Sequence, residues 1–396
     1  MSQETKFSES ILQKRIKRFK SIKRGYYSLI ILVSLYILSL FSPLLINNKA
    51  LIVKYENKYY FPLFNDLFGS IINQDNIEAK DLGQFYVKGK KKFGQPHYRL
   101  LKKQYEKGNN GNWAILPLYP YGPYEEVLSE LDEDYEDLNE NGIWDEWEPF
   151  IDDNDNGIRD EFRPATFPDK YYVLGTDNQG RNVLSRLVYG FRISLTFAIV
   201  VWFLSYLIGI TIGASLGYFG GKLDLYGVRF IEIYSSIPFL FMIMMIASFI
   251  RPSIFILASL MIILFGWVSI CWFIRGEFYR EKAKDYVSAA IAMGQSHWKV
   301  MFKHILPNAL TPIITNAPFA MMGYIGSLVS LDYLGFGLQP PTPSWGELIS
   351  QASGNLLNWH LVLFPLIVMA ITLFIITLIG EGFRAAFDPK AHSRLR

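Results

Sequence analysis

Six long apolar runs without a charged residue constrain this chain more than any other feature of its sequence. Each run is near or above the roughly 18–20 residues that an α-helix needs to cross the hydrocarbon core of a membrane. The sequence therefore predicts an all-α polytopic membrane protein with six transmembrane helices. The runs are Tyr26–Ile46, Ile193–Gly221, Ile233–Ile250, Pro252–Ile274, Ile305–Leu331 and Leu361–Gly380.

Composition excludes two other classes of protein. Of the 396 residues, 51% are hydrophobic, which is too apolar for a soluble protein of this size. The single cysteine, Cys271, lies inside the fourth run, so we expect neither a disulfide framework nor a metal-thiolate cluster.

The first run is longer than the roughly 7–15 apolar residues of a signal peptide and no small-residue cleavage site follows it. We therefore expect an uncleaved first span.

The charges are distributed unevenly and predict the orientation. Residues 125–163 hold 17 acidic and 2 basic residues, whereas residues 1–24 hold 8 basic and 2 acidic ones. Basic residues also flank the polar segment Asp285–Asn308. Short basic flanks stay on the cytoplasmic side. We therefore expect a multi-pass protein of the cytoplasmic (inner) membrane with both termini in the cytoplasm and the acidic region outside.

These patterns predict five segments along the chain. A basic cytoplasmic N-terminus (residues 1–25) precedes the first span (26–46) and a long extracytoplasmic insert (47–189). A core of five spans (190–384) and a cytoplasmic tail (385–396) follow. Within the insert, Val53–Phe64 is rich in aromatic residues around an Asn-Lys pair, which favours a short β-hairpin.

The acidic region contains the spacing of an EF-hand calcium loop. Oxygen-bearing side chains at alternate positions converge on one cation when a glycine permits a tight turn, and here that glycine is Gly142. The predicted ligands of the first loop are Asp137, Asn139, Asn141, the carbonyl of Ile143, Asp145 and Glu148.

A second copy of this pattern begins fifteen residues later. Its candidate ligands are Asp152, Asn154, Asn156 and Asp160, but Arg163 stands where the twelfth-position carboxylate belongs. Extracellular sites of this kind bind calcium with dissociation constants of roughly 10⁻⁴–10⁻³ M. We expect a structural Ca²⁺ site that orders the insert; a merely acidic, solvated linker is the alternative.

Residues Gly175–Leu195 lead into the second span. Asp177 can cap a helix whose apolar stripe includes Leu184 and Leu187, and this predicts an interfacial helix at the outer membrane surface. The second span contains Gly209, Gly213 and Gly217, a doubled GxxxG pattern that lets another helix approach closely. The same residues spell G-x-S-x-G around Ser215, but a hydrolase nucleophile needs a strand-to-helix elbow that a membrane helix does not provide.

The segment Asp285–Asn308 is the largest polar stretch among the later spans and predicts a helical hairpin. Asp285 and Ser296 can cap its two short helices, and Gly294 fits the left-handed position that ends the first one. We expect a small face for docking a soluble partner, made by Ala289, Ala290 and Met293. We expect an apolar face against the bundle, made by Trp298, Met301, Phe302 and Ile305.

This hairpin resembles the EAA loop of ABC-importer permeases. Ala289, Ala290, Gly294, Leu306 and Pro307 fall on that family's pattern, and Ser288 stands where the family has glutamate. The resemblance implies a coupling helix that sits in a cleft of a separate ATPase subunit. The implied coupling residues are Tyr286, Ser288, Ala289, Ala290, Gly294, Leu306 and Pro307.

Three further motifs resemble C-type permeases of dipeptide, oligopeptide and nickel importers. They are the GTDNQGRNVLSRLVYGFRISL stretch that begins at Gly175, the outer loop SLDYLGFGLQPPTPSWGELI from Ser330 to Ile349, and the ending GEGFRAAFDPK. We expect the outer loop to be rigid because of its prolines, with Trp345 at the membrane interface. KYYFPLF after the first span resembles the microcin-C and larger-peptide subgroup.

The resemblance implies the permease subunit of an ATP-driven importer of peptides or related small solutes, working by alternating access. It implies as partners a second homologous permease, two cytoplasmic ATPase subunits and an extracytoplasmic solute-binding protein. The chain has no G-x-x-x-x-G-K-[ST] phosphate loop, so ATP hydrolysis would lie on another chain and we expect no catalytic residue. A calcium-binding receptor or scaffold without transport is the alternative. The sequence does not identify the substrate or the residues that line its path.

Overall fold

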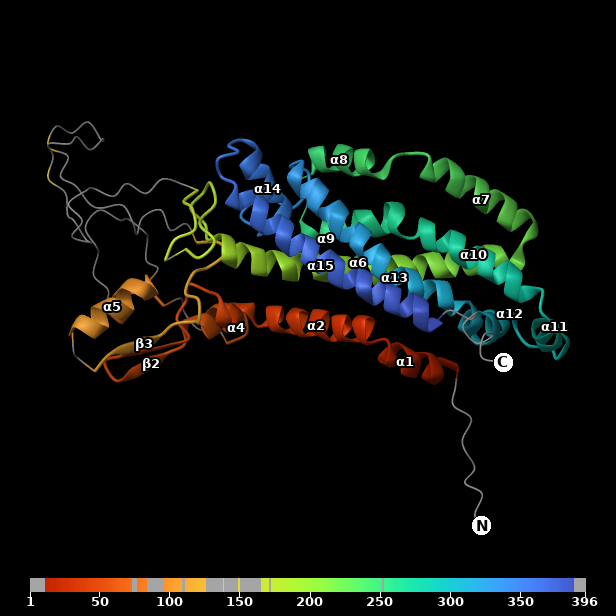
Figure 1. The fold of residues 1–396 in the computed structure, drawn as a ribbon, viewed down its shortest axis with the longest axis horizontal. Helices are drawn as coiled ribbons and strands as arrows, with labels where there is room; N and C mark the ends of the chain where they lie inside the picture. Colours follow the sequence, from red (N-terminus) through yellow and green to blue (C-terminus); the bar gives the residue numbers. More distant parts are fainter. Residues whose placement is uncertain are drawn as a thin grey trace, which may run out of the picture. The chain divides into compact units, whose positions relative to one another are not determined.

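The computed structural model describes residues 11–72, 77–83, 96–108, 111–125, 138, 149, 165–170, 172–250 and 253–387 (Figure 1). The predicted calcium ligands all lie outside these residues, as does the tail beyond Phe387. The described residues belong to two compact units. The core unit comprises residues 1–36, 192–340 and 366–396, and the insert unit comprises residues 37–191 and 341–365.

Five helices in the described residues are long and apolar enough to cross a membrane. A sixth span follows if one bent pair of helices is counted as a single crossing, which agrees with the six predicted spans. The five are α2 (Lys23–Leu40), α6 (Val183–Phe219), the continuous segment Ile254–Lys282, the continuous segment His297–Tyr333, and α15 (His360–Phe387).

The bent pair consists of α7 (Gly221–Ser235) and α8 (Phe239–Phe249), which meet at 66° (Figure 1). Pro238 stands directly before α8 with an extended backbone. A proline lacks the amide hydrogen that would continue the preceding helix. The third predicted span is therefore broken at Pro238.

Two of the continuous segments contain a stretch of π-helix. In Ile254–Lys282, the helices α9 (Ile254–Met261) and α10 (Val268–Lys282) are joined by the π-helix η2 (Ile262–Gly266). In His297–Tyr333, the short helix α12 (His297–Lys299) passes through the π-helix η3 (Val300–Ile305) into α13 (Leu306–Tyr333).

The glycine face of α6 packs directly on the backbone of α10 and its lead-in, as the sequence predicts. A Cβ atom added to Gly209 would lie 2.5 Å from the carbonyl oxygen of Trp267, and one on Gly213 would lie 2.5 Å from that of Cys271. A Cβ on Gly217 would lie 2.6 Å from the carbonyl oxygen of Arg275. The two helices are close because these positions carry only hydrogen. Within α6, the Ser215 hydroxyl donates to the carbonyl of Thr211 at 2.8 Å, which is an ordinary helix contact.

The N-terminal helix α1 (Ile11–Ser21) belongs to the core unit and packs on the end of α15. Phe19 is buried and its ring stacks on that of Phe383, with centroids 4.5 Å apart. Gly25, near the start of α2, approaches Gly382 so closely that a Cβ atom on it would lie 2.9 Å from the Gly382 Cα. The two ends of the core unit are therefore packed together.

The insert unit contains a small three-stranded antiparallel sheet with strand order β2-β1-β3. The strands are β1 (Ile52–Tyr55), β2 (Lys58–Tyr60) and β3 (Trp113–Ile115). The predicted hairpin is confirmed, but its turn is one residue earlier than expected, at Glu56 and Asn57, which both have positive φ. The helix α5 (Tyr98–Gly108) lies beside the sheet (Figure 1). Its residues Tyr98, Leu101 and Tyr105 are buried in a core that it shares with the sheet. The remaining short elements before the second span are α3 (Ser42–Leu45), α4 (Pro62–Ile72) and η1 (Ala79–Leu82).

A buried cluster of four charged side chains holds the rest of the insert unit together. Asp177 accepts a hydrogen bond from Nε of Arg181 at 2.8 Å and lies 3.4 Å from Nε of Arg186. Glu347 pairs with both arginines, at 2.8 Å from Nη2 of Arg181. Burial lowers the pKa of the Arg181 guanidinium, but the two carboxylates raise it above its ordinary value overall. Two cations therefore balance two anions inside the unit.

This cluster corrects two predictions for the residues before the second span. Asp177 does not cap a helix; its carboxylate instead binds the arginines and the backbone amides of Gln179 and Arg181. There is also no separate interfacial helix, because α6 starts at Val183 and continues without a break to Phe219. Of the predicted apolar stripe, Leu187 is buried and Leu184 is half-buried inside the protein.

The prediction that Trp345 lies in a loop at the membrane interface is also wrong. Trp345 is 1% exposed and begins the helix α14 (Trp345–Ser353), whose N-cap is the side chain of Ser344. Its indole Nε1–H donates to the carbonyl oxygen of Leu187 at 3.1 Å, and its ring fills the space beside Gly190. A buried tryptophan is stable in such a place because its polar atom has a partner.

Candidate functional site

The hairpin predicted for Asp285–Asn308 is present in the core unit (Figure 1). Its first helix, α11 (Asp285–Ala292), ends at Gly294, which has φ +74° as expected. The amide of Gln295 donates to the carbonyl of Ala290 at 3.3 Å, which is the six-to-one bond of a Schellman motif. A glycine is favoured at this turn because the left-handed conformation places a Cβ atom in conflict with the backbone.

Of the two predicted helix caps in the hairpin, the one at Asp285 is wrong, and the one at Ser296 is right in position but makes no capping hydrogen bond. Asp285 is the first residue of α11, and the N-cap position belongs to Lys284, which makes no capping bond with its side chain. Ser296 occupies the N-cap position of α12, but its side chain accepts no capping hydrogen bond. The second half of the hairpin is also not a separate helix, because it continues through η3 into α13.

The inner and outer faces of the hairpin differ from the predicted ones. Ala290, expected on the docking face, is 1% exposed and belongs to the core cluster of the bundle. Trp298 and Phe302, expected against the bundle, are 62% and 36% exposed and their rings stack on each other. Met301 and Ile305 are buried as expected. The π-helix η3 explains why some of the predicted bundle-facing residues are exposed and others are buried. Its wider turn breaks the α-helical spacing on which the prediction rested.

The predicted coupling residues lie on both faces. Tyr286, Ser288, Ala289, Gly294 and Pro307 are exposed, Leu306 is half-buried, and Ala290 is buried. The exposed residues share the surface with apolar and basic side chains that sequence reasoning did not assign to it. We call this surface the coupling face: Tyr286, Ser288, Ala289, Ile291, Met293, Gly294, Trp298, Lys299, Phe302 and Lys303, all of them exposed.

Polar contacts fix the hairpin to the membrane helices. Glu281, buried near the end of α10, accepts hydrogen bonds from Lys284 at 2.7 Å and from the hydroxyl of Tyr286 at 2.9 Å. Burial and the hydrogen bond to Glu281 raise the pKa of Tyr286, so this hydroxyl keeps its proton and donates. The hydroxyl of Tyr218, at the end of α6, lies 2.9 Å from Nδ1 of His297. These hydrogen bonds link the hairpin to both α6 and α10.

Sequence reasoning missed Glu281 as an anchor. With Ser288 at the usual glutamate position, the hairpin has no carboxylate there, and Glu281 supplies one from the preceding helix. The available signal was the spacing of Glu281 and Lys284, which places the two on neighbouring positions of a helical turn.

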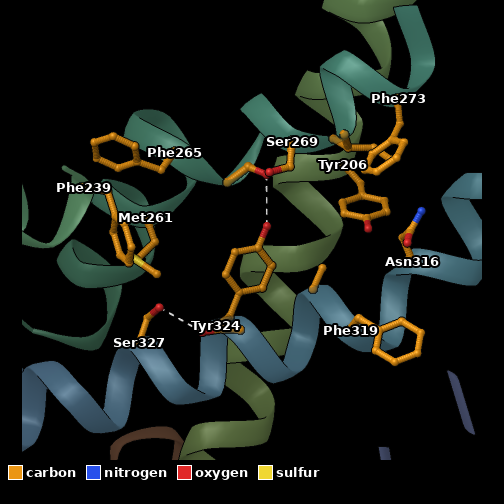
Figure 2. Close-up of a pocket in the computed structure, with 14 residues that line it drawn as sticks. Tyr206, Phe239, Met261, Phe265, Ser269, Phe273, Asn316, Phe319, Tyr324 and Ser327 are labelled. Atoms are coloured by element: carbon orange, nitrogen blue, oxygen red, sulfur yellow. Dashed lines mark hydrogen bonds between the residues drawn. The ribbon is translucent and has the colours of Figure 1, made fainter. Parts of the chain in front are cut away.

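A cavity of about 380 Å³ opens within the membrane helices of the core unit (Figure 2). Its lining residues come from α6, α8, α9, η2, α10 and α13. None of its fourteen lining residues carries a charge. Six of them are aromatic: Tyr206, Phe239, Phe265, Phe273, Phe319 and Tyr324.

The cavity borders the π-helix η2. The hydroxyl of Tyr324 on α13 donates to the carbonyl oxygen of Gly266, the last residue of η2, at 3.0 Å (Figure 2). Short π-helical stretches inside α-helices occur often at functional sites. The cavity is thus a second candidate site, apart from the coupling face.

Metal binding was predicted only for the acidic region, and its ligands lie outside the described residues. Within the described ranges, no three histidine, cysteine, aspartate or glutamate side chains are grouped as a metal ion would require. The calcium loops therefore remain a prediction from the sequence.

Comparison with known proteins identifies one family model and several relatives, and all of these are membrane components of transport systems. The family model of binding-protein-dependent transport system inner membrane components matches residues 209–393. The peptidoglycan transport system permease protein YejE of Agrobacterium fabrum is 36% identical over 96% of this chain and 93% of its own length. The inner membrane ABC transporter permease protein YejE of Escherichia coli is 35% identical over 95% of this chain and 96% of its own length.

A third relative matches a shorter part. The oligopeptide transport system permease protein OppC of Haemophilus influenzae is 37% identical over 56% of this chain and 71% of its own length. The two YejE proteins are thus similar along nearly the whole chain, insert included, whereas the similarity to OppC covers little more than half of it.

Proposed function

The chain belongs to the family of binding-protein-dependent transport system inner membrane components, and from that premise we propose that it carries peptides or related small solutes across the inner membrane. It is a multi-pass permease subunit of an ABC importer and not an enzyme, so ATP hydrolysis takes place on a separate chain. The peptide assignment is supported by the relatives, whose names refer to peptidoglycan, oligopeptide and dipeptide transport. Similarity to YejE along nearly the whole chain supports the larger-peptide subgroup.

The mechanism that we propose rests on the exposed residues of the coupling face. It gathers four exposed apolar side chains, those of Ile291, Met293, Trp298 and Phe302, and an apolar patch of this kind suits contact with a protein partner. Lys299 and Lys303 beside them suit an acidic rim on that partner. We assign this face to the cytoplasmic ATPase subunit, with α11 as the coupling helix.

The anchors of the hairpin convert ATPase movement into movement of the spans. When the ATPase subunits close, they displace α11 and the turn at Gly294. Because Glu281 ties the hairpin to α10 and Tyr218 ties it to α6, both helices move with it. Alternating access then requires only that these helices rock between two packings. The break between α7 and α8 is a place where the third span can bend during this movement.

The importer that we propose has four further subunits. A second homologous permease completes the path, two ATPases bind the coupling faces, and an extracytoplasmic solute-binding protein delivers the substrate. Both termini and the hairpin lie in the cytoplasm, and the insert lies outside. The basic flanks support this orientation.

Purification of the tagged chain from its native membrane in mild detergent tests this assembly. We expect an ABC ATPase and a second six-span permease in the eluate, and ATP-dependent peptide uptake once the purified complex and its binding protein are placed in vesicles. A chain that elutes alone, while other transporters of the same membrane stay assembled, would overturn the proposal. Assembly without uptake of any peptide would overturn the substrate class alone.

We also propose that the acidic part of the insert binds Ca²⁺ as a structural clip, with the ligands of the Asp137–Glu148 loop and, less completely, those of Asp152–Asp160. Trp144 and Trp147 lie inside the first loop. Calcium at millimolar concentration should therefore change the tryptophan fluorescence and protect the insert from protease. Asp137→Asn should remove both responses; a wild-type chain that shows neither response would refute the site.

A further inference from the structure

We propose that the cavity bounded by η2 and α13 binds an uncharged, preferably aromatic, side chain of the transported peptide. This inference rests on the proposed function and adds a site to it. The volume of about 380 Å³ lies within the roughly 300–1,000 Å³ typical of small-molecule sites. It suits a side chain with its adjoining peptide bond.

The lining of the cavity disfavours charged side chains of a bound peptide. Because none of the fourteen lining residues is charged, a lysine or glutamate side chain that entered the cavity would lose its hydration without gaining a counter-ion. Phe239, Phe265, Phe273 and Phe319 offer ring faces and edges instead, which favour contact with another aromatic ring (Figure 2).

The polar groups of the lining distinguish a peptide from a lipid chain. The side-chain hydroxyl of Ser269 makes no hydrogen bond to any residue that the structure describes, although it lies in a membrane-spanning segment. The amide nitrogen of Asn316 donates to the carbonyl of Pro312 at 2.9 Å, and its oxygen remains open for a donor. Such groups are costly in hydrocarbon unless they find partners. A peptide bond supplies both a donor and an acceptor, whereas an acyl chain supplies neither.

The backbone around the cavity is built so that it can respond to an occupant. The π-helix η2 forms one wall, and the bond from Tyr324 to the carbonyl of Gly266 links that wall to α13. Since α13 continues directly from the coupling hairpin, a side chain held in the cavity touches a helix that the ATPase moves. The site therefore lies on the path of the coupled movement.

Two glycines of α13 give a matched pair of variants. Gly323 lines the cavity and Gly326 does not, yet a Cβ atom on either glycine meets no other atom within 4 Å. Gly323→Leu fills the cavity, whereas Gly326→Leu adds the same side chain outside it. The assay is uptake by the complete importer of two tetrapeptides, Ala-Ala-Ala-Ala and Ala-Phe-Ala-Ala.

We expect Gly323→Leu to lower uptake of the phenylalanine peptide about tenfold relative to the alanine peptide, since burial of one phenylalanine side chain contributes that much or more. Gly326→Leu should leave the ratio unchanged. An equal loss for both peptides with Gly323→Leu, or no loss, would overturn the proposal. Loss of the second permease from the Gly323→Leu complex would also overturn the proposal, because the cavity would then be part of the packing surface between the two permeases.

A second experiment measures peptide binding in the cavity and does not depend on transport. Cys271 is fully buried, so cysteines introduced at exposed positions can be labelled selectively. Ser269→Cys lies on the cavity wall and Gly276→Cys lies on the same helix outside it. We expect the phenylalanine peptide to slow maleimide labelling of Ser269→Cys several-fold and that of Gly276→Cys not at all. Equal rates with and without peptide would contradict the site; protection without uptake would leave the site in place and refute only the proposed transport.

Discussion

Gly294→Arg is expected to leave the chain inserted in the membrane and to abolish its assembly with the ATPase subunit. Gly294 is exposed, has φ +74° and has no atom within 4 Å of an added Cβ. An arginine there adds a long side chain that stands between the coupling face and the ATPase subunit, without displacing any side chain of this protein. Quantification of the ATPase that co-purifies with the tagged variant checks the result, and we expect a loss of at least tenfold.

Backbone strain must be separated from the loss of docking. A non-glycine residue in the left-handed conformation costs roughly 1–2 kcal/mol at any position. Gly335, beyond the other end of α13, has φ +81° and is equally unobstructed, so Gly335→Arg carries the same strain away from the coupling face. Normal ATPase recovery is expected for Gly335→Arg. If Gly294→Arg also retained its ATPase, the coupling face would be assigned wrongly.

Gly213→Leu is expected to disrupt the packing of α6 on α10 and to destabilise the whole core unit. Even the first added carbon would lie 2.5 Å from the carbonyl oxygen of Cys271, which is backbone and cannot turn aside. Overpacking that forces backbone to shift costs roughly 1–3 kcal/mol or more. We expect a clear fall in the temperature at which the detergent-solubilised chain loses its monodisperse peak on size exclusion.

Gly276→Leu is the matched control, because Gly276 lies on α10 but an added Cβ meets nothing within 4 Å. Its melting temperature should stay near that of the natural chain. Equal temperatures for Gly213→Leu and Gly276→Leu would show that the glycine face does not hold the two helices together.

Local and compositional features of this protein were predictable from its sequence. Charge-free runs predict spans because hydrocarbon tolerates no unpaired charge, and the doubled GxxxG predicts close packing because it depends on one helix face alone. Gly294 was predictable for the same reason, since its left-handed turn depends only on the residues around it.

Features that depend on distant partners were not predictable. Asp177 had the chemistry of a helix cap, but Arg186 and Glu347 turn it into part of a buried cluster, and Glu347 is far away in the sequence. Trp345 had the chemistry of an interfacial residue, but the carbonyl of Leu187 satisfies its indole inside the protein. The π-helices η2 and η3 carry no local signature, so the exposure of Trp298 and the wall of the cavity could be found only in the structure.

Cross-linking from the coupling face tests whether this face contacts the ATPase subunit. Met293 and Leu356 are 72% and 80% exposed, and Cys271 is buried, so Met293→Cys and Leu356→Cys can each carry one photoactivatable cross-linker in the assembled importer. We expect a covalent adduct with the ATPase subunit from position 293 and none from position 356. An ATPase that co-purifies but forms no adduct at position 293, or forms one only at position 356, would contradict this expectation.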